Sequence, residues 1–395
     1  MSFQRAHYQT LEKRIREPRR FIQVVLGPRQ VGKTTLVNQL TSSLKDGYHY
    51  VSADSVPASD SRWVQQQWES ARLMMKHRRS EDFLLVIDEI QKIDDWSEVV
   101  KSNWDSDTRN KLNMKVILLG SSRLLIQHGL SESLAGRFEL LHMDHWTYSE
   151  MRDAFGWDAD RYAWFGGYPG SAALVDEEGR WKDYVRNALI ETSISKDILM
   201  MSRIEKPALL KRLFELGCLY SGQVLSFTKI MGQLTDAGNT TTLSHYLELL
   251  DTAGLLGGIG KYAGDVIRKR ASSPKFQVHN TALISAQSVE TLSEVRMRPE
   301  RWGRIVESAV GAHLLNHSHS GDFSLYYWRE GNEEMDFVLE RQGKVVGLEV
   351  KSGASGNTNS MAAFHRRVGP FKTLLIGASG IPWQDFLSMD PSELF

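Results

Sequence analysis

The sequence predicts a multidomain α/β protein. At 395 residues the chain exceeds what one ordinary hydrophobic core supports, so two to four domains are expected. An apolar strand, a glycine-containing loop and a helix follow one another at 21–40. Three short helices and a hairpin follow between 207 and 278, and the last hundred residues read as helix, three strands, helix and strand. We expect domains at 1–205, 206–290 and 291–395.

Composition and charge restrict the class of protein. Lys plus Arg equals Asp plus Glu at 48 each, so any site for an acidic partner must be local. The N-terminus lacks the apolar core of a secretory signal, and no apolar run is long enough to span a bilayer. The single cysteine, Cys218, excludes a disulfide framework and a cysteine-based zinc site. We expect a soluble cytoplasmic protein with no membrane partner.

The strongest motif lies near the N-terminus, where GPRQVGKT fits the pattern G-x-x-x-x-G-K-[ST]. It follows an apolar strand, 21–26, and precedes a helix, 34–40, so backbone N–H groups can close around phosphates at a helix N-terminus. Lys33 is expected to reach the β- and γ-phosphates of ATP, and Thr34 to ligate Mg²⁺. The predicted phosphate-binding positions are Gly27, Pro28, Arg29, Gln30, Val31, Gly32, Lys33, Thr34 and Thr35.

A second strand, 83–89 (FLLVIDE), ends in two acids and has the form of a Walker B motif. Asp88 is expected to hold Mg²⁺, directly or through water, and Glu89 to polarise the attacking water. Such a pair about fifty residues after a phosphate-binding loop indicates ATP binding.

Two further positions have open interpretations. A third strand, 116–122, ends in Ser121 and Ser122, either of which is a polar sensor of the γ-phosphate or part of a plain strand-to-loop turn. Arg137 follows Gly136 and is either a finger that reaches a neighbouring subunit's nucleotide or an exposed structural arginine.

With these residues, the stretches DEIQKIDDW (88–96), LLGSSRLLI, SLAGRFEL and FGGYPG (165–170) resemble a prokaryotic family of AAA+ ATPases with a C-terminal half of unknown function. The resemblance covers nearly the whole chain. It implies the ATPase roles of Lys33, Thr34, Asp88 and Glu89, and extends to Ser122 and Arg137. It also implies a homo-oligomer, with a hexameric ring as one form. Residues 146–205 are expected to form a helical lid over the nucleotide.

The middle region predicts a winged helix-turn-helix. Helices are expected from Pro207, over 226–234 and after Asn239, followed by a hairpin within 255–278, and the resemblance agrees. Residues 206–280 hold nine Lys or Arg against five Asp or Glu, which favours contact with DNA phosphates. The alternative is a winged helix used for packing. The exposed candidates are Thr241, Ser244, His245 and Glu248 on the third helix and Lys261, Arg268, Lys269 and Arg270 on the hairpin.

The last hundred residues predict a restriction-endonuclease-like module. Its expected helix at 302–317, strands at 323–328, 335–339 and 345–350, helix at 361–368 and strand at 373–376 give the order αβββαβ. That order is the core of the PD-(D/E)XK nuclease superfamily. Met335 stands where the motif's proline would be.

Four residues of this module form a candidate nuclease site. Glu349 and Lys351 are two apart on a strand and therefore share a face. Glu307, Asp336 and Glu349 are the predicted ligands of Mg²⁺, with Mn²⁺ as an alternative, and Lys351 would position water or stabilise charge. The competing interpretation is a retained scaffold with a surface ion pair, because residues 302–395 hold eight Lys or Arg against eleven Asp or Glu.

The sequence therefore predicts an ATP-hydrolysing AAA+ protein that couples nucleotide state to DNA binding and to metal-dependent phosphodiester cleavage. One alternative is a regulatory DNA- or protein-binding ATPase whose nuclease-like domain is inert. Another is a signal-transducing ATPase that never touches nucleic acid.

Overall fold

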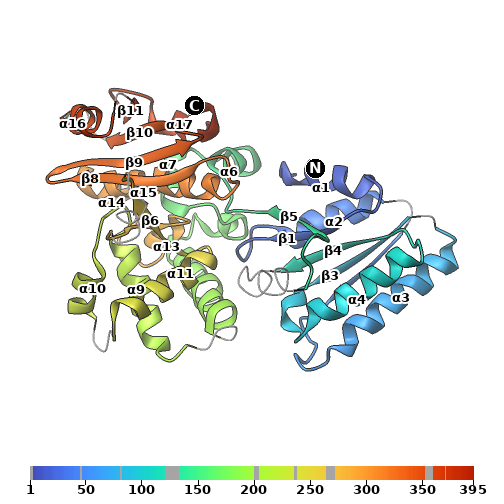
Figure 1. Ribbon diagram of the computed structural model, residues 1–395. Coiled ribbons are helices and arrows are strands. Elements are labelled where there is room, and N and C mark those ends of the chain that lie inside the picture. The colour runs from blue at the N-terminus through green and yellow to red at the C-terminus, as the bar shows by residue number, and fades with distance from the viewer. Residues whose placement is uncertain are drawn as a thin grey trace. The chain divides into compact units, whose positions relative to one another are not determined.

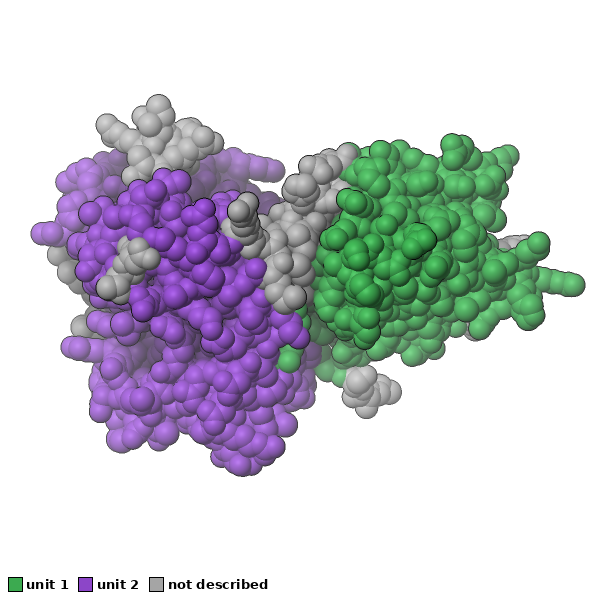
Figure 2. Space-filling view, turned by 90° about the horizontal axis from the view of Figure 1, so that it is seen from below, with its two compact units in different colours: residues 1–143 green, residues 144–395 purple. Residues whose placement is uncertain are grey.

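The computed structural model describes residues 3–395 except 45–46, 81, 121–132, 200–203, 235–237, 264–271, 352–358 and 370. Its contacts divide the chain into two compact units, Met1–Met143 and Asp144–Phe395 (Figure 2). The first unit ends well before residue 205, the expected end of the ATPase domain. The boundaries expected after 205 and 290 stay predictions.

Unit 1 contains a five-stranded parallel sheet in the order β2-β3-β4-β1-β5 (Figure 1). Every residue of β1, β3 and β4 is buried, as expected of strands covered on both faces. The apolar runs that predicted these three strands are thus confirmed. The strands are β1 (Ile22–Leu26), β2 (Tyr48–Ser52), β3 (Phe83–Asp88), β4 (Met114–Gly120) and β5 (Phe138–His142).

Helices cover both faces of this sheet and enclose two cores. One core joins the sheet to α1 and α2 through Leu11, Leu36 and Leu40. The other joins it to α3 and α4 through Trp68 and Trp104. The helical elements are α1 (His7–Arg16), α2 (Lys33–Ser43), α3 (Arg62–Arg78), the short η1 (Ile90–Lys92) and α4 (Trp96–Arg109).

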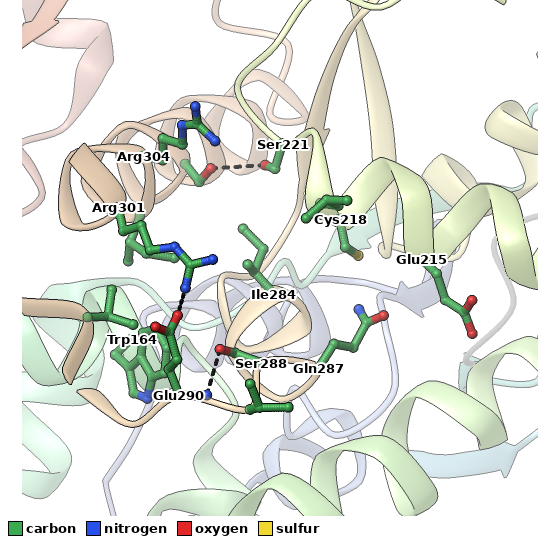
Figure 3. A pocket seen from close by; sticks show the side chains of 15 residues that line it. Trp164, Glu215, Cys218, Ser221, Ile284, Gln287, Ser288, Glu290, Arg301 and Arg304 are labelled. Carbon is green, nitrogen blue, oxygen red and sulfur yellow. Dashed lines mark hydrogen bonds and ion pairs between the residues drawn. The ribbon is translucent and has the colours of Figure 1, made fainter. Parts of the chain in front are cut away.

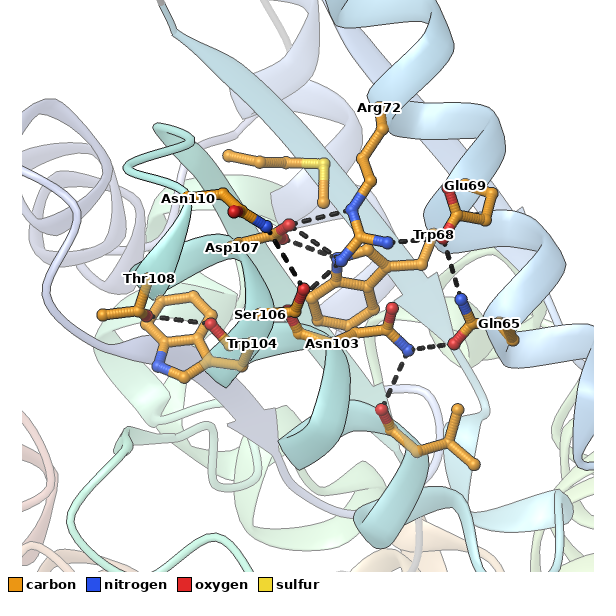
Figure 4. A network of polar contacts seen from close by, with 12 residues as sticks. Gln65, Trp68, Glu69, Arg72, Asn103, Trp104, Ser106, Asp107, Thr108 and Asn110 are labelled. Atoms are coloured by element: carbon orange, nitrogen blue, oxygen red, sulfur yellow. Dashed lines mark hydrogen bonds and ion pairs between the residues drawn. The ribbon is translucent and has the colours of Figure 1, made fainter.

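A buried polar network ties α3 to α4 (Figure 4). The fully buried carboxylate of Asp107 accepts hydrogen bonds from Trp68 Nε1 at 2.7 Å and from Arg72 Nε at 2.8 Å. Asn103 Nδ2 donates to Gln65 Oε1 at 2.5 Å. Because a buried carboxylate is tolerated only when it is paired, the network fixes the relative position of the two helices.

Unit 2 is built around a six-stranded sheet in the order β11-β10-β9-β8-β6-β7. β6 (Leu256–Lys261) and β7 (Lys275–Val278) form the predicted antiparallel hairpin. β6 also pairs in parallel with β8 at Gly260↔Tyr326 and Lys261↔Tyr327, so the hairpin extends the C-terminal sheet. The remaining strands are β8 (Ser324–Glu330), β9 (Glu333–Arg341), β10 (Lys344–Lys351) and β11 (Lys372–Gly377).

The expected αβββαβ order is present in the C-terminal segment as α15, β8, β9, β10, α16 and β11. Three short helices, α9 to α11, precede the hairpin as predicted. The bounds are α9 (Pro207–Leu219), α10 (Phe227–Gln233), α11 (Thr240–Thr252), α13 (Ala282–Ser285), α14 (Leu292–Arg296), α15 (Pro299–Ser318), α16 (Asn359–Arg367), α17 (Trp383–Phe386) and η5 (Pro391–Leu394).

The segment expected to be a lid is helical and belongs to unit 2. Its backbone meets Asn280, whose Oδ1 accepts from Gly167 N at 3.1 Å. A Cβ at Gly167 would lie 2.1 Å from the carbonyl oxygen of Trp146, so only glycine fits there. Its role as a lid stays a prediction. The elements are α6 (Tyr148–Phe155), α7 (Ala159–Phe165), η2 (Pro169–Leu174), α8 (Glu178–Tyr184), η3 (Val185–Ile190) and η4 (Ser193–Leu199).

Among the helices that the structure describes, none combines the length and apolar character required to cross a lipid bilayer.

Candidate nucleotide site and acidic cluster

The glycine-rich loop joins the end of β1 to the start of α2, as the sequence predicts. Gly32 precedes the helix with a left-handed φ of 94°, which favours glycine. A Cβ on Gly27 would lie 2.0 Å from the carbonyl oxygen of Met143, so a side chain there is excluded. The first backbone N–H groups of α2 have no partner within the helix and are suited to bind an anion.

Lys33 lies inside this loop and is only 8% exposed. Its Nζ donates to the carbonyl oxygens of Gly27 at 2.8 Å and Pro28 at 2.7 Å. The ammonium is thus held at the loop by two backbone carbonyl oxygens.

Oxygen ligands gather around Asp88 at the end of β3. The Thr34 hydroxyl donates to Asp88 Oδ2 at 3.0 Å, and the Tyr50 hydroxyl donates to the same oxygen at 2.6 Å. Burial raises the pKa of Tyr50, and so does its hydrogen bond to Asp88. Asp88 is 7% exposed. A carboxylate beside a hydroxyl is a donor set that suits Mg²⁺, so these residues fit the expected ion.

Glu89 directly follows the carboxylate and has a left-handed φ of 53°. Its N–H donates to Asp88 Oδ1 at 2.9 Å, and its Oε2 accepts from Gln91 Nε2 at 2.5 Å. A non-glycine residue held in this region stores strain of about 1–3 kcal/mol. Gln91 fixes the direction of the carboxylate expected to act on water.

The two other predicted residues of this unit have different outcomes. Arg137 makes a bidentate ion pair in its own chain, with Nε at 2.8 Å from Asp105 Oδ1 and Nη2 at 3.1 Å from Oδ2. The hydrogen bond from Arg137 lowers the pKa of Asp105. A role of Arg137 toward a neighbouring subunit stays a prediction. Ser121 and Ser122 lie outside the described residues.

In unit 2, the four predicted nuclease residues lie on α15, β9 and β10. Lys351 Nζ is 2.8 Å from Glu349 Oε1, so these two side chains share a face as predicted. Asp336 Oδ2 accepts from the N–H of Val350 at 2.8 Å, which places Asp336 beside the same end of β10. Glu307 faces the cluster from α15, and a Cβ on Gly222 would be only 3.3 Å from its Oε1.

Sequence reasoning missed the residue at the centre of this cluster. Lys275 on β7 is fully buried, and its Nζ lies 2.9 Å from Glu307 Oε1 and 3.5 Å from Asp336 Oδ1. It also donates to the carbonyl oxygen of Asp336 at 3.1 Å and lies 3.7 Å from Glu334 Oε1. Burial alone would lower the pKa of Lys275, but the carboxylates of Glu307 and Asp336 raise it above the ordinary value.

Glu349 is the most constrained acid of the cluster. It is 4% exposed, and its Oε2 has no hydrogen-bond partner. Burial raises the pKa of Glu349 to about 7, and the nearby charge of Asp336 acts in the same direction. The amine of Lys351 opposes this shift only in part.

The fit of a metal ion can be tested on this geometry. Among the described residues, no three or more His, Cys, Asp or Glu side chains are placed to hold one ion. The position between Glu307 and Asp336 is taken by the ammonium of Lys275. With Lys275 in place, the acids fit an internal ammonium in preference to a metal ion. Metal binding by Glu307, Asp336 and Glu349 stays a prediction.

A separate pocket of about 460 Å³ lies among α9, α13, α14 and α15 (Figure 3). Trp164, Cys218 and Ile284 line it, and Arg301 is ion-paired with Glu290 there. Burial raises the pKa of the Cys218 thiol to about 12, so the thiolate needed for nucleophilic chemistry is disfavoured. Cys218 is thus a buried free cysteine.

The helix expected to contact DNA has the predicted division of faces. On α11, Leu243, Tyr246, Leu247 and Leu250 are buried, whereas Thr241, Ser244, His245 and Glu248 are exposed. Asn239 caps the N-terminus of the helix, and its side chain accepts from Thr242 N at 2.8 Å. Lys261 is described at the end of β6, and Arg268, Lys269 and Arg270 lie outside the described residues.

Three family models match separate parts of the chain. Residues 19–152 match an AAA domain. Unit 1 thus has the parallel-sheet P-loop fold of an AAA domain. Residues 156–293 match a domain of unknown function, DUF8612, and residues 302–378 match another, DUF4143. Lys275 therefore lies in one matched segment, and the acids it contacts lie in the next.

Individual relatives are distant. An uncharacterised protein of Methanocaldococcus jannaschii is 22% identical over 346 residues, which cover 82% of this chain and 73% of that protein. RuvB of Thermotoga maritima matches with 18% identity and a TM-score of 0.31, covering 64% of this chain and 86% of that one. AMPPCP-bound DnaA from Aquifex aeolicus matches with 14% identity and a TM-score of 0.33, covering 62% and 87%. TM-scores this low carry no argument about fold or function.

Proposed function

We propose that the chain is an ATP-binding and ATP-hydrolysing AAA+ protein. The observation that carries the proposal is the hydrogen bond from Thr34 to Asp88, which joins the start of α2, where Lys33 lies, to the end of β3, next to Glu89. The match of residues 19–152 to an AAA domain supports it. Mg²⁺ bound with ATP would supply charge neutralisation for the phosphates.

Each residue of the site has a defined task in this proposal. Lys33 exchanges the carbonyl oxygens of Gly27 and Pro28 for phosphate oxygens. Thr34 and Asp88, already hydrogen-bonded to each other, would hold the ion. Glu89 accepts a proton from water, and Gln91 keeps its carboxylate oriented.

The test separates nucleotide binding from hydrolysis. In Glu89→Gln we expect nucleotide binding to persist while phosphate release falls by about 10²–10⁴-fold, because only the proton acceptor is lost. In Lys33→Ala we expect both binding and hydrolysis to be lost. Fluorescent-nucleotide titration and steady-state phosphate release measure the two quantities.

Gln66→Ala serves as the control, since Gln66 is exposed on α3, and it should match the unmodified chain. Unchanged hydrolysis in Glu89→Gln would contradict the assignment of Glu89.

For unit 2, we infer a DNA-contacting role under nucleotide control, supported by the exposed polar face of α11. Unit 2 is either a metal-dependent nuclease or a regulatory module with an inert nuclease-like domain. Lys275 favours the regulatory module, because its ammonium fills the position between Glu307 and Asp336. Phosphodiester cleavage at Glu307, Asp336, Glu349 and Lys351 stays a prediction from the sequence. A homo-oligomer completed by Arg137 is likewise a prediction.

A further inference from the structure

The acidic cluster of unit 2 is spaced for an ammonium ion. The oxygens around Lys275 Nζ lie at 2.9 Å (Glu307 Oε1), 3.1 Å (Asp336 O), 3.5 Å (Asp336 Oδ1) and 3.7 Å (Glu334 Oε1). Mg²⁺ and Ca²⁺ require oxygens at about 2.0–2.6 Å, so an ion at the position of Nζ would reach these oxygens only if they moved inward. The spacings match hydrogen-bond and ion-pair distances to nitrogen instead.

Lys275 is also held firmly at the backbone. Its strand β7 pairs with β6 at Ile259↔Lys275 on one side. On the other side, Val224 forms a bridge with Lys275, and Phe276 N donates to Gln223 O at 2.9 Å. The side chain passes over the ring of Phe337, whose centroid is 4.7 Å from Nζ. The backbone pairing of β7 therefore fixes the position from which the ammonium of Lys275 reaches the cluster.

The surroundings show that more positive charge would be accepted. Glu349 is almost fully buried and has one oxygen without a partner. Glu307 and Asp336 share a single fully buried cation. Removing that cation would leave carboxylates facing each other in a poorly solvated site, which is costly unless another cation enters or one of the acids takes up a proton.

We propose that Lys275 is the resident cation of this cluster: its ammonium takes the place of a divalent metal ion between Glu307 and Asp336. The cluster then binds a hard divalent cation only when the ammonium is removed. This inference goes beyond ATP hydrolysis by unit 1 and does not depend on it.

The first experiment counts bound Mn²⁺ by electron paramagnetic resonance in the full chain without nucleotide. Asp88→Asn is included throughout, so that the carboxylate of the nucleotide site does not contribute. The chain with Lys275 should bind no ion at the cluster, whereas Lys275→Met, which keeps the length of the side chain, should gain one ion per chain. Adding Asp336→Asn to Lys275→Met should abolish that gain, and Lys229→Met, an exposed lysine on α10, should gain nothing.

Two results would overturn the proposal. One is Mn²⁺ bound in the presence of Lys275 and lost in Asp336→Asn, because ion and ammonium would then coexist. The other is a folded Lys275→Met chain, checked by circular dichroism, that binds no Mn²⁺.

A second measurement does not require any Lys275 variant to fold. In buffer with EDTA, Glu307→Gln should lower Tm by several degrees, on the order of 5 °C, because it takes a charged partner from Lys275. If the cluster were a vacant metal site, Glu307→Gln would raise Tm, because neutralising one of several facing acids relieves their repulsion. A rise in Tm therefore refutes the resident cation. Neither measurement uses nucleotide, so both test the role of Lys275 independently of the proposal that unit 1 hydrolyses ATP.

Discussion

Single residues in the nucleotide site compete for the same carboxylate. Asp88 Oδ2 accepts from both Thr34 and Tyr50, so an incoming Mg²⁺ must displace or share these donors. The phenol of Tyr50 makes the shorter hydrogen bond, at 2.6 Å. It therefore acts as the stronger competitor for the oxygen.

We expect Tyr50→Phe to lower the Mg²⁺ concentration that gives half-maximal ATP hydrolysis. A hydrogen bond to a charged acceptor contributes about 1.5–3 kcal/mol, so we expect a shift of at least about tenfold. A Mg²⁺ titration of phosphate release at fixed ATP measures it, with Tyr48→Phe, half exposed on the same strand, as the control. An increased Mg²⁺ requirement would instead show that Tyr50 orients Asp88 for the ion.

At the scale of single residues, sequence motifs predict those site residues that lie close together along the chain. Lys33 and Thr34 follow Gly32 within one motif, and Asp88 ends an apolar run. Tyr50 was not predictable in this way, because it reaches Asp88 only through the pairing of β2 with β3. Lys275 was missed for a related reason: a lysine at the start of a strand is usually exposed, and 32 positions separate it from Glu307.

At the scale of elements, the face of a helix follows from its periodicity, whereas its neighbours do not. The spacing of Leu243, Tyr246, Leu247 and Leu250 predicted the buried side of α11 and left its polar side exposed. The same reasoning found the β6–β7 hairpin but treated it as a separate wing. The pairing of β6 with β8, at Gly260↔Tyr326 and Lys261↔Tyr327, shows that the hairpin belongs to the C-terminal sheet.

We expect the combined substitution Thr241→Ala, Ser244→Ala and His245→Ala to weaken DNA binding by about tenfold, because these exposed side chains would lose hydrogen bonds to the duplex. Gel-shift titrations at several salt concentrations measure the affinity. The dependence on salt should be retained, since the substituted residues carry no fixed positive charge.

Ser293→Ala, an exposed change on α14, is the control for this experiment. No binding by the unmodified chain at low salt would favour an ATPase that does not contact nucleic acid.

At the scale of the whole molecule, the pH dependence of stability depends on buried histidine. His313 on α15 is almost fully buried, and its Nε2 lies 3.1 Å from the carbonyl oxygen of Met389. Burial lowers the pKa of His313 to about 3, and the neighbouring His317 acts in the same direction. Between about pH 6.5 and pH 3, His313 is therefore protonated in the unfolded chain and neutral in the folded chain.

The free energy of unfolding should therefore fall as pH drops below about 6.5, by about 2 kcal/mol at pH 5 from His313 alone. His313→Gln keeps a donor for the carbonyl of Met389 without titrating, and should reduce this fall. Urea unfolding at pH 7.5 and pH 5 measures the difference. His245→Gln, which is exposed, should leave the fall unchanged, and an equal fall in His313→Gln would contradict the assignment.

The sheet to which both matched segments contribute strands has a consequence for how the segments are inherited. Residues 302–378 bring Glu307 and Asp336, but their counter-charge arrives from Lys275, inside the segment 156–293. Recombination that transferred only residues 302–378 would separate the acids from Lys275. The buried carboxylates would then lack their counter-charge. We therefore expect the two segments to be inherited together, and a change in one to be tolerated only when the other segment is compatible with it.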